Sequence, residues 1–62
     1  MNILVTNFED SNEDVMIFTD NPKYNAIEVE KTLKDKGKTF EEVYEVEDKD
    51  LQYYLYDPCY LD

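Results

Sequence analysis

The chain has a single cysteine, Cys59, so no disulfide within its 62 residues can hold the fold together. A chain of this length hides only about 60% of the surface that its unfolded form exposes, and its core is therefore small. The apolar share of 42%, with six tyrosines and three phenylalanines, still indicates a folded protein rather than a disordered acidic tail. We expect one compact domain over residues 1–62, stabilised by hydrophobic burial without covalent cross-links.

Two segments rich in β-branched and aromatic residues lie on either side of a polar stretch near the start of the chain. Residues 3–8 and 15–19 favour strands, whereas the acidic residues 9–14 favour a loop. The sequence therefore predicts a β-hairpin.

An amphipathic helix is predicted to follow this hairpin. Asp20 or Asn21 can cap its first amides, and Pro22 suits its first turn. Apolar residues recur at helical spacing at Ala26, Val29 and Leu33. Gly37 supplies a left-handed residue after the last turn, so we expect the helix to end near Lys36.

Two further strands are expected in the C-terminal half. Residues 39–46 alternate in polarity, and residues 51–56 are rich in aromatic residues and are followed by Asp57 and Pro58, which favour a turn. One face of the first of these strands would carry Phe40, Tyr44 and Val46.

The predicted order of elements is ββαββ, which indicates a small α+β fold. The strand-helix-strand unit in the middle should place its two strands parallel, with the helix on one face, and the outer strands should pair antiparallel with them. The expected result is a mixed four-stranded sheet whose second face is open to solvent or covered by a partner.

Residues 15–43 resemble the first strand, helix and second strand of glutaredoxins, which have a thioredoxin-like fold. The residues that match are Val15 to Thr19, Leu33, Lys36, Gly37 and Phe40 to Val43. In this resemblance, residues 23–26 stand where the family has its Cys-x-x-Cys site, and the cis-proline and glutathione-binding segments have no counterpart. The resemblance implies the frame of a redoxin without thiol exchange, because both thiols are absent. It also implies that the N-terminal strand takes the sheet position of a later antiparallel strand of the family.

Residues 13–24 resemble a strand-and-turn segment of the phage inhibitor of uracil-DNA glycosylase. That family's separate acidic segment, which engages the DNA groove of the enzyme, has no match in this chain, so none of its functional residues is carried over. The resemblance implies a type of protein, namely one that is small, acidic and inhibitory because it imitates DNA.

The residues for most catalytic chemistry are missing. No histidine is present, which removes the usual general base near neutral pH and the commonest metal ligand. We interpret the carboxylate pairs Glu41/Glu42 and Glu47/Asp48 as solvated strand and loop residues, and Cys59 as a packing residue. The acidic loops lack calcium-loop spacing, and a single glycine cannot form a phosphate-binding loop. We expect no enzyme activity, no metal site and no cofactor.

The net charge of −10 is unevenly distributed along the chain. Residues 1–21 carry −5, residues 22–38 carry +2 because five lysines lie there, and residues 39–62 carry −7. A negative field repels nucleic acid and anionic membranes and attracts basic protein surfaces. We therefore expect a host protein as partner, with no direct binding of nucleic acid or membrane. No secretory leader or bilayer-length apolar run is visible, so a cytoplasmic protein is expected.

Tyrosines and acids coincide in the C-terminal half, where five of the six tyrosines fall in the last nineteen residues. Tyrosine rings offer a large contact area at low entropic cost, and carboxylates can imitate phosphates. If residues 51–56 form a strand, alternation separates Tyr53 from Tyr54 and Tyr56, and both core packing and partner binding are open to these rings. The candidate partner-binding residues are Glu41, Glu42, Glu45, Glu47, Asp48, Asp50, Tyr54 and Tyr56.

These features favour a non-enzymatic acidic interaction protein, such as a phage-encoded inhibitor or DNA mimic that blocks a basic groove of a host nucleic-acid-binding enzyme. A second hypothesis is a redox-inactive glutaredoxin-like module that binds a redox partner. A third is a structural homodimer in which the uncovered sheet face mates with its own copy. Acidity that serves solubility is a further interpretation of the charge.

Overall fold

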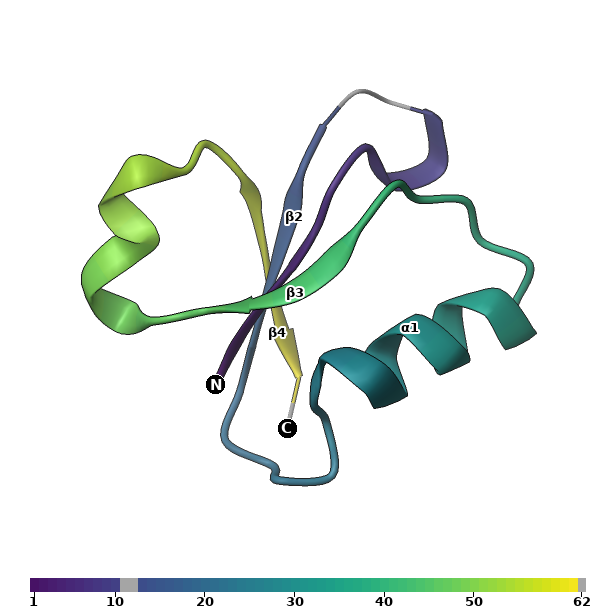
Figure 1. Ribbon diagram of the computed structural model, residues 1–62, viewed down its shortest axis with the longest axis horizontal. Coiled ribbons are helices and arrows are strands. Elements are labelled where there is room, and N and C mark those ends of the chain that lie inside the picture. The colour runs from purple at the N-terminus through teal and green to yellow at the C-terminus, as the bar shows by residue number, and fades with distance from the viewer. Residues whose placement is uncertain (11–12, 62) are drawn as a thin grey trace.

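The computed structural model describes residues 1–10 and 13–61, and within them it has four strands, one α-helix and two short 3-10 helices (Figure 1). The strands are β1 (Asn2–Val5), β2 (Val15–Thr19), β3 (Val43–Val46) and β4 (Asp57–Leu61). The helices are η1 (Phe8–Asp10), α1 (Ala26–Asp35) and η2 (Asp48–Tyr53). The predicted α+β class is confirmed: the strands form a mixed four-stranded sheet with one main helix.

The strands lie in the order β3-β1-β2-β4, so β1 is central. It pairs antiparallel with β2 on one side and with β3 on the other, whereas β4 pairs parallel with β2. The expected hairpin of the first two strands is therefore present. The expectation that β4 would pair antiparallel with the central unit is wrong.

The strands on either side of the helix, β2 and β3, run in the same direction, as expected, but β1 lies between them. The residues of β1 explain this central position. Ile3, Leu4 and Val5 are apolar on both faces of the strand, and such a strand is stable at the centre of a sheet, where both faces are covered.

Helix α1 begins later than predicted. Its N-cap is Asn25, whose Oδ1 accepts the backbone N–H of Glu28 at 2.9 Å. Asn21 instead accepts the backbone N–H of Lys23 at 3.0 Å and so forms a turn before the helix, a competing use of asparagine side chains. The end of the helix agrees with the prediction, because Lys36 is the C-cap and Gly37 has a φ of +70°.

The last predicted strand is wrong, because residues 48–53 form η2 and the strand follows at Asp57–Leu61. Pro58 lies inside this strand rather than after it. A proline is tolerated there because β4 is at the edge of the sheet, where not every N–H needs a partner. Strand β3 is also shorter than expected, and Phe40 packs with the α1 side of the sheet, opposite the Tyr44 side.

Each face of the sheet has its own buried cluster, and each cluster is covered by a different segment. On the α1 face the buried residues are Ile3, Val5, Ile17 and Val29. On the other face Leu4, Met16 and Val46 are buried beneath Phe18, Tyr44, Leu51, Tyr54 and Tyr56. The second face is thus covered by η2 and the residues after it, which corrects the expectation of a solvent-exposed or partner-covered face.

We predict that Leu4→Ala lowers the free energy of unfolding by about 2–5 kcal/mol, because Leu4 is 1% exposed and its loss leaves a cavity. A chain of this length has a total stability of roughly 3–9 kcal/mol, so the loss would be large. Urea denaturation followed by circular dichroism measures it. The matched control is Leu55→Ala, which removes the same atoms from a side chain that is 93% exposed and should change stability by less than about 0.5 kcal/mol. Equal losses in the two variants would contradict this placement of the core.

Candidate functional site

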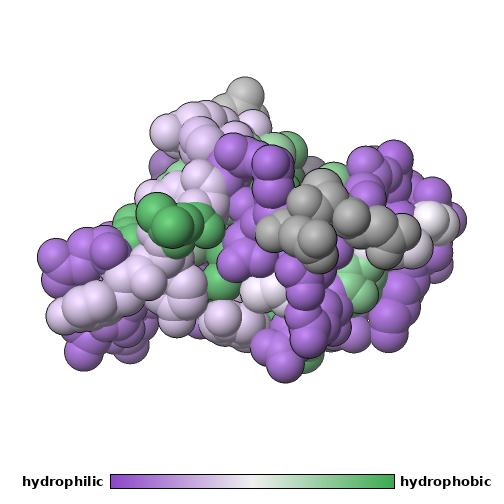
Figure 2. All heavy atoms as spheres, turned by 90° about the horizontal axis from the view of Figure 1, so that it is seen from above, coloured by the Kyte–Doolittle hydropathy of each residue, from purple (hydrophilic) through white to green (hydrophobic). Residues whose placement is uncertain are grey.

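Six of the eight predicted partner-binding residues are acids that follow one another along β3 and the segments on either side of it. We call this set the acidic edge; it consists of Glu41, Glu42, Glu45, Glu47, Asp48 and Asp50. Strand β3 is an edge strand, so no strand of the described residues pairs with its outer side. All of these residues except Asp50 are exposed. The fold therefore places the carboxylates in solvent along one border of the molecule. Figure 2, which views the molecule from above, shows hydrophilic surface at both of its ends.

The first end of the acidic edge is tied to the segment after β1. The backbone N–H of Glu41 donates to the carbonyl of Thr6 at 2.8 Å, and that of Glu42 donates to the Thr6 hydroxyl at 2.9 Å. The backbone N–H of Thr6 donates in return to the carbonyl of Glu42 at 2.9 Å. The side-chain amide of Asn7 also donates to the carboxylate of Glu41. These bonds give both glutamates a defined backbone position.

The other end of the acidic edge is held by a buried amide. The side chain of Asn2 donates to the carbonyl of Val46 at 3.1 Å and to the carboxylate of Asp48 at 2.6 Å. Lys49 forms an ion pair with Glu47 at 3.3 Å, but both side chains are about three-quarters exposed, so the pair contributes little. Asp48 is thus oriented by hydrogen bonding to a group in the core.

The two predicted tyrosines, Tyr54 and Tyr56, differ from the exposed acidic edge. Both are half-buried on the second face of the sheet. The ring of Tyr56 meets Phe18 edge to face, with 5.8 Å between centroids. Burial raises the pKa of the Tyr44 hydroxyl, and the nearby Tyr54, to which it is hydrogen-bonded, raises it further. Tyr54 and Tyr56 therefore pack in the core as well as reaching the surface.

The most exposed tyrosines are two that belong to the C-terminal tyrosine group but were not among the predicted partner-binding residues. Tyr53 and Tyr60 are each 76% exposed, and Tyr60 stacks on Phe18 with 5.3 Å between ring centroids. The alternation expected for a strand over residues 51–56 does not decide which of these tyrosines are exposed, because the first half of that segment is η2. The signal that was available is Asp48 and Asp50 at the start of η2, since acids favour the first turn of a helix.

A second group of acids comes together from distant parts of the chain. Glu13 precedes β2 and Asp57 begins β4, and with Asp14, Leu55 and Tyr56 they line a shallow hollow. A hydrogen bond with Asp57 and the repulsion between the two carboxylates raise the pKa of Glu13. Asp14 links the two strands, since its carbonyl accepts the backbone N–H of Asp57 at 2.8 Å. Sequence patterns could not find this pair because only the β2–β4 pairing brings its members together.

Residues 1–10 and 13–61 contain few other groups of side chains that could bind a ligand or react. No cluster of three or more His, Cys, Asp or Glu side chains there could hold a metal ion. No helix in the same residues combines the length and apolar character needed to cross a bilayer. Cys59 is a free thiol, half-buried on the α1 side of β4.

Comparison with known proteins adds no relative from which a function could be transferred. No family model matches the chain, and no similar curated protein or solved structure was found. The resemblances to glutaredoxins and to the glycosylase inhibitor therefore stay predictions.

The pair of Glu13 and Asp57 predicts a local dependence of stability on pH. The pKa of Glu13 is raised in the folded state, so the folded protein binds this proton more tightly than the unfolded chain. Its stabilising effect is present below the usual carboxyl pKa and is lost as the pH rises through the raised value. We expect Glu13→Gln to melt at a higher temperature than the wild type at pH 7, with the difference shrinking in acid.

Melting curves between pH 4 and pH 7 test this expectation. The control is Glu45→Gln, which removes the same charge from an exposed position on β3. If both variants change the melting temperature equally at every pH, the proposed pairing of Glu13 with Asp57 is wrong.

Proposed function

We propose that this chain is a non-enzymatic interaction protein whose acidic edge binds a basic groove of a host protein, in the manner of an inhibitor that takes the place of DNA. The observation that supports it best is the row of exposed carboxylates along the outer strand β3 and its flanks. In the described part of the chain, only Lys49 forms an ion pair with this row. Most of its charge is therefore available to an outside partner.

The distribution of lysines supports this use of the acidic edge. The five lysines of residues 22–38 lie on or near α1, and two of them form ion pairs with Glu30 and Glu9 rather than with the acidic edge. A surface of one sign attracts a basic partner over distances of about 10 Å at 0.1 M salt. The expected partner is a protein with a basic surface, such as a nucleic-acid-binding enzyme.

Rigidity of the acidic edge also favours binding. Hydrogen bonds with Thr6 fix the backbone of Glu41 and Glu42, and bonds from Asn7 and Asn2 orient the carboxylates of Glu41 and Asp48 before any partner arrives. Groups that are already ordered lose less entropy on association, so more of the electrostatic attraction appears as affinity. The acidic edge thus combines charge with a defined arrangement.

The experiment compares two variants that lose the same charge at different places. One changes Glu41, Glu42, Glu45 and Glu47 to glutamine; the other neutralises Asp20, Glu28, Glu30 and Asp35, which lie on or before α1. The wild-type chain first captures its partner from the native cell, and purified components are then used to measure affinity. We expect the acidic-edge variant to bind at least about tenfold more weakly, which corresponds to 1.4 kcal/mol, whereas the α1 variant binds nearly as the wild type does.

Two further measurements address the imitation of DNA. Raising the salt concentration should weaken the complex, and double-stranded DNA should compete with the chain for the partner. Equal losses of affinity in both variants would show that net charge rather than the acidic edge matters. A complex that is insensitive to salt and to DNA would contradict the proposal, and a redoxin client as the captured partner would favour the redoxin-like alternative.

A further inference from the structure

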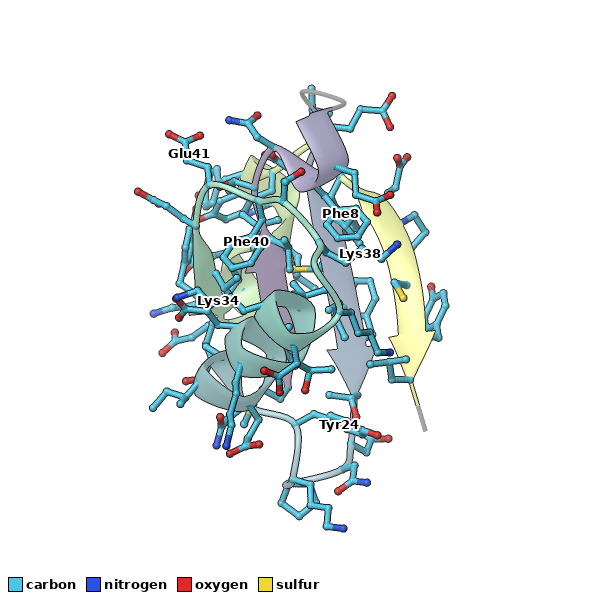
Figure 3. The ribbon with its side chains drawn as sticks, turned by 90° about the vertical axis from the view of Figure 1, so that its right-hand side faces the viewer. Phe8, Tyr24, Lys34, Lys38, Phe40 and Glu41 are labelled. Atoms are coloured by element: carbon cyan, nitrogen blue, oxygen red, sulfur yellow. The ribbon has the colours of Figure 1, made fainter. Side chains whose placement is uncertain are left out.

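A groove runs between α1 and the half of the sheet formed by β2 and β4. Helix α1 packs mainly against β3, so it leaves the β2 and β4 side of its face less covered. The open space has a volume of about 320 Å³. Figure 3 looks onto this side, with Phe8 and Lys38 toward one end and Tyr24 toward the other. The volume lies at the lower end of the range for small-molecule sites.

The walls of the groove are almost wholly apolar. The sheet contributes side chains of all its strands except β3, and α1 contributes the side of the helix that carries its buried residue. The main lining residues are Val5, Val15, Ile17, Val29, Leu33 and Cys59. An apolar surface of this kind favours a hydrocarbon ligand, because removing apolar surface from water lowers the free energy.

One end of the groove carries positive charge in a protein whose net charge is −10. Lys36 and Lys38 both line the groove. Lys38 forms an ion pair with Glu9 at 2.8 Å, whereas Lys36 makes no ion pair in the described residues. Lys36 is therefore the side chain best placed to meet an anion.

The helix end beside these lysines does not oppose an anion strongly. Unpaired carbonyls at a helix C-terminus would repel a negative group. Here the carbonyls of Thr32, Leu33 and Lys34 accept the backbone N–H groups of Lys36, Lys38 and Gly37 at 2.9 to 3.1 Å. These three carbonyls thus have partners within the chain, and Lys36 is a charge at this end of the groove that no ion pair in the described residues offsets.

We propose that the groove binds a single-chain, medium-length carboxylate, with its hydrocarbon tail between α1 and the β2 and β4 strands and its carboxylate at Lys36. The apolar walls match the tail, and the lysine end matches the charge. A phosphate or a nucleotide would leave most of the apolar wall without an apolar contact. This site is separate from the acidic edge, because the groove includes no residue of β3 or η2.

Cys59 offers a direct measurement of occupancy because it lies in the wall of the groove. Decanoate is the probe, and the neutral reagent iodoacetamide alkylates the thiol. We expect decanoate to slow alkylation along a saturation curve, by about threefold at twice its dissociation constant, because one-third of the molecules are then open. Glutathione alkylated under the same conditions controls for effects on the reagent, and circular dichroism checks that the protein stays folded.

The charge of the ligand and of the groove are tested separately. Decyltrimethylammonium has a similar tail and the opposite charge, so it should protect Cys59 much less than decanoate does. Lys36→Gln should raise the dissociation constant of decanoate about threefold to fivefold, the size expected for an exposed ion pair. The matched control is Lys31→Gln, which removes the same charge from another side of α1, beside Ile27 and Asp35, and should leave decanoate binding unchanged.

Several outcomes would overturn the proposal. Decanoate that fails to protect Cys59, a cationic probe that protects equally, or equal effects of the two lysine variants would each exclude a carboxylate held at Lys36. Sedimentation with phosphatidylglycerol vesicles in the absence of decanoate protection would assign the groove to a membrane surface instead. The acidic-edge variant should still bind decanoate, because none of its changed residues lines the groove. If decanoate does not bind, the proposed partner-binding function is therefore unaffected.

Discussion

The burial of β1 at the centre of the sheet is the constraint on which the rest of the structure depends. Ile3, Leu4 and Val5 are each at most 1% exposed. Because successive side chains of a strand point to opposite faces, Ile3 and Val5 enter the cluster beneath α1, and Leu4 enters the cluster beneath η2. Both covering segments therefore pack on the same four-residue strand, and a change there affects both halves of the small core.

The central position of β1 decides what lies at the borders of the sheet. With β1 and β2 inside, β3 and β4 become the edges, and the acids around β3 are brought to a border that no other strand of residues 1–10 and 13–61 covers. Charged edge strands discourage pairing between copies of a protein. The same carboxylates that we propose as a binding surface thus also protect this edge from association with itself.

The shortness of α1 explains why the two faces of the sheet differ. A helix of ten residues is about 15 Å long and covers only part of a four-stranded sheet. It lies over β3 and leaves the groove beside β2 and β4, whereas the second face is covered by the aromatic residues that follow η2. The cluster of lysines along residues 22–38, which has no part in the acidic edge, contributes the charged end of that groove.

Local patterns in the sequence determined the hairpin, the amphipathic helix with its end at Gly37, and the class of the fold, because spacing and turn residues act over a few neighbouring positions. They also determined the segregation of charge and the acids of the candidate surface. Only the tertiary structure decided that β1 separates β2 from β3, that residues 48–53 form η2, and that Glu13 meets Asp57. These features depend on which distant segments bury each other's apolar surface, and a short stretch of residues carries only a partial sign of that competition, such as the acids at the start of η2.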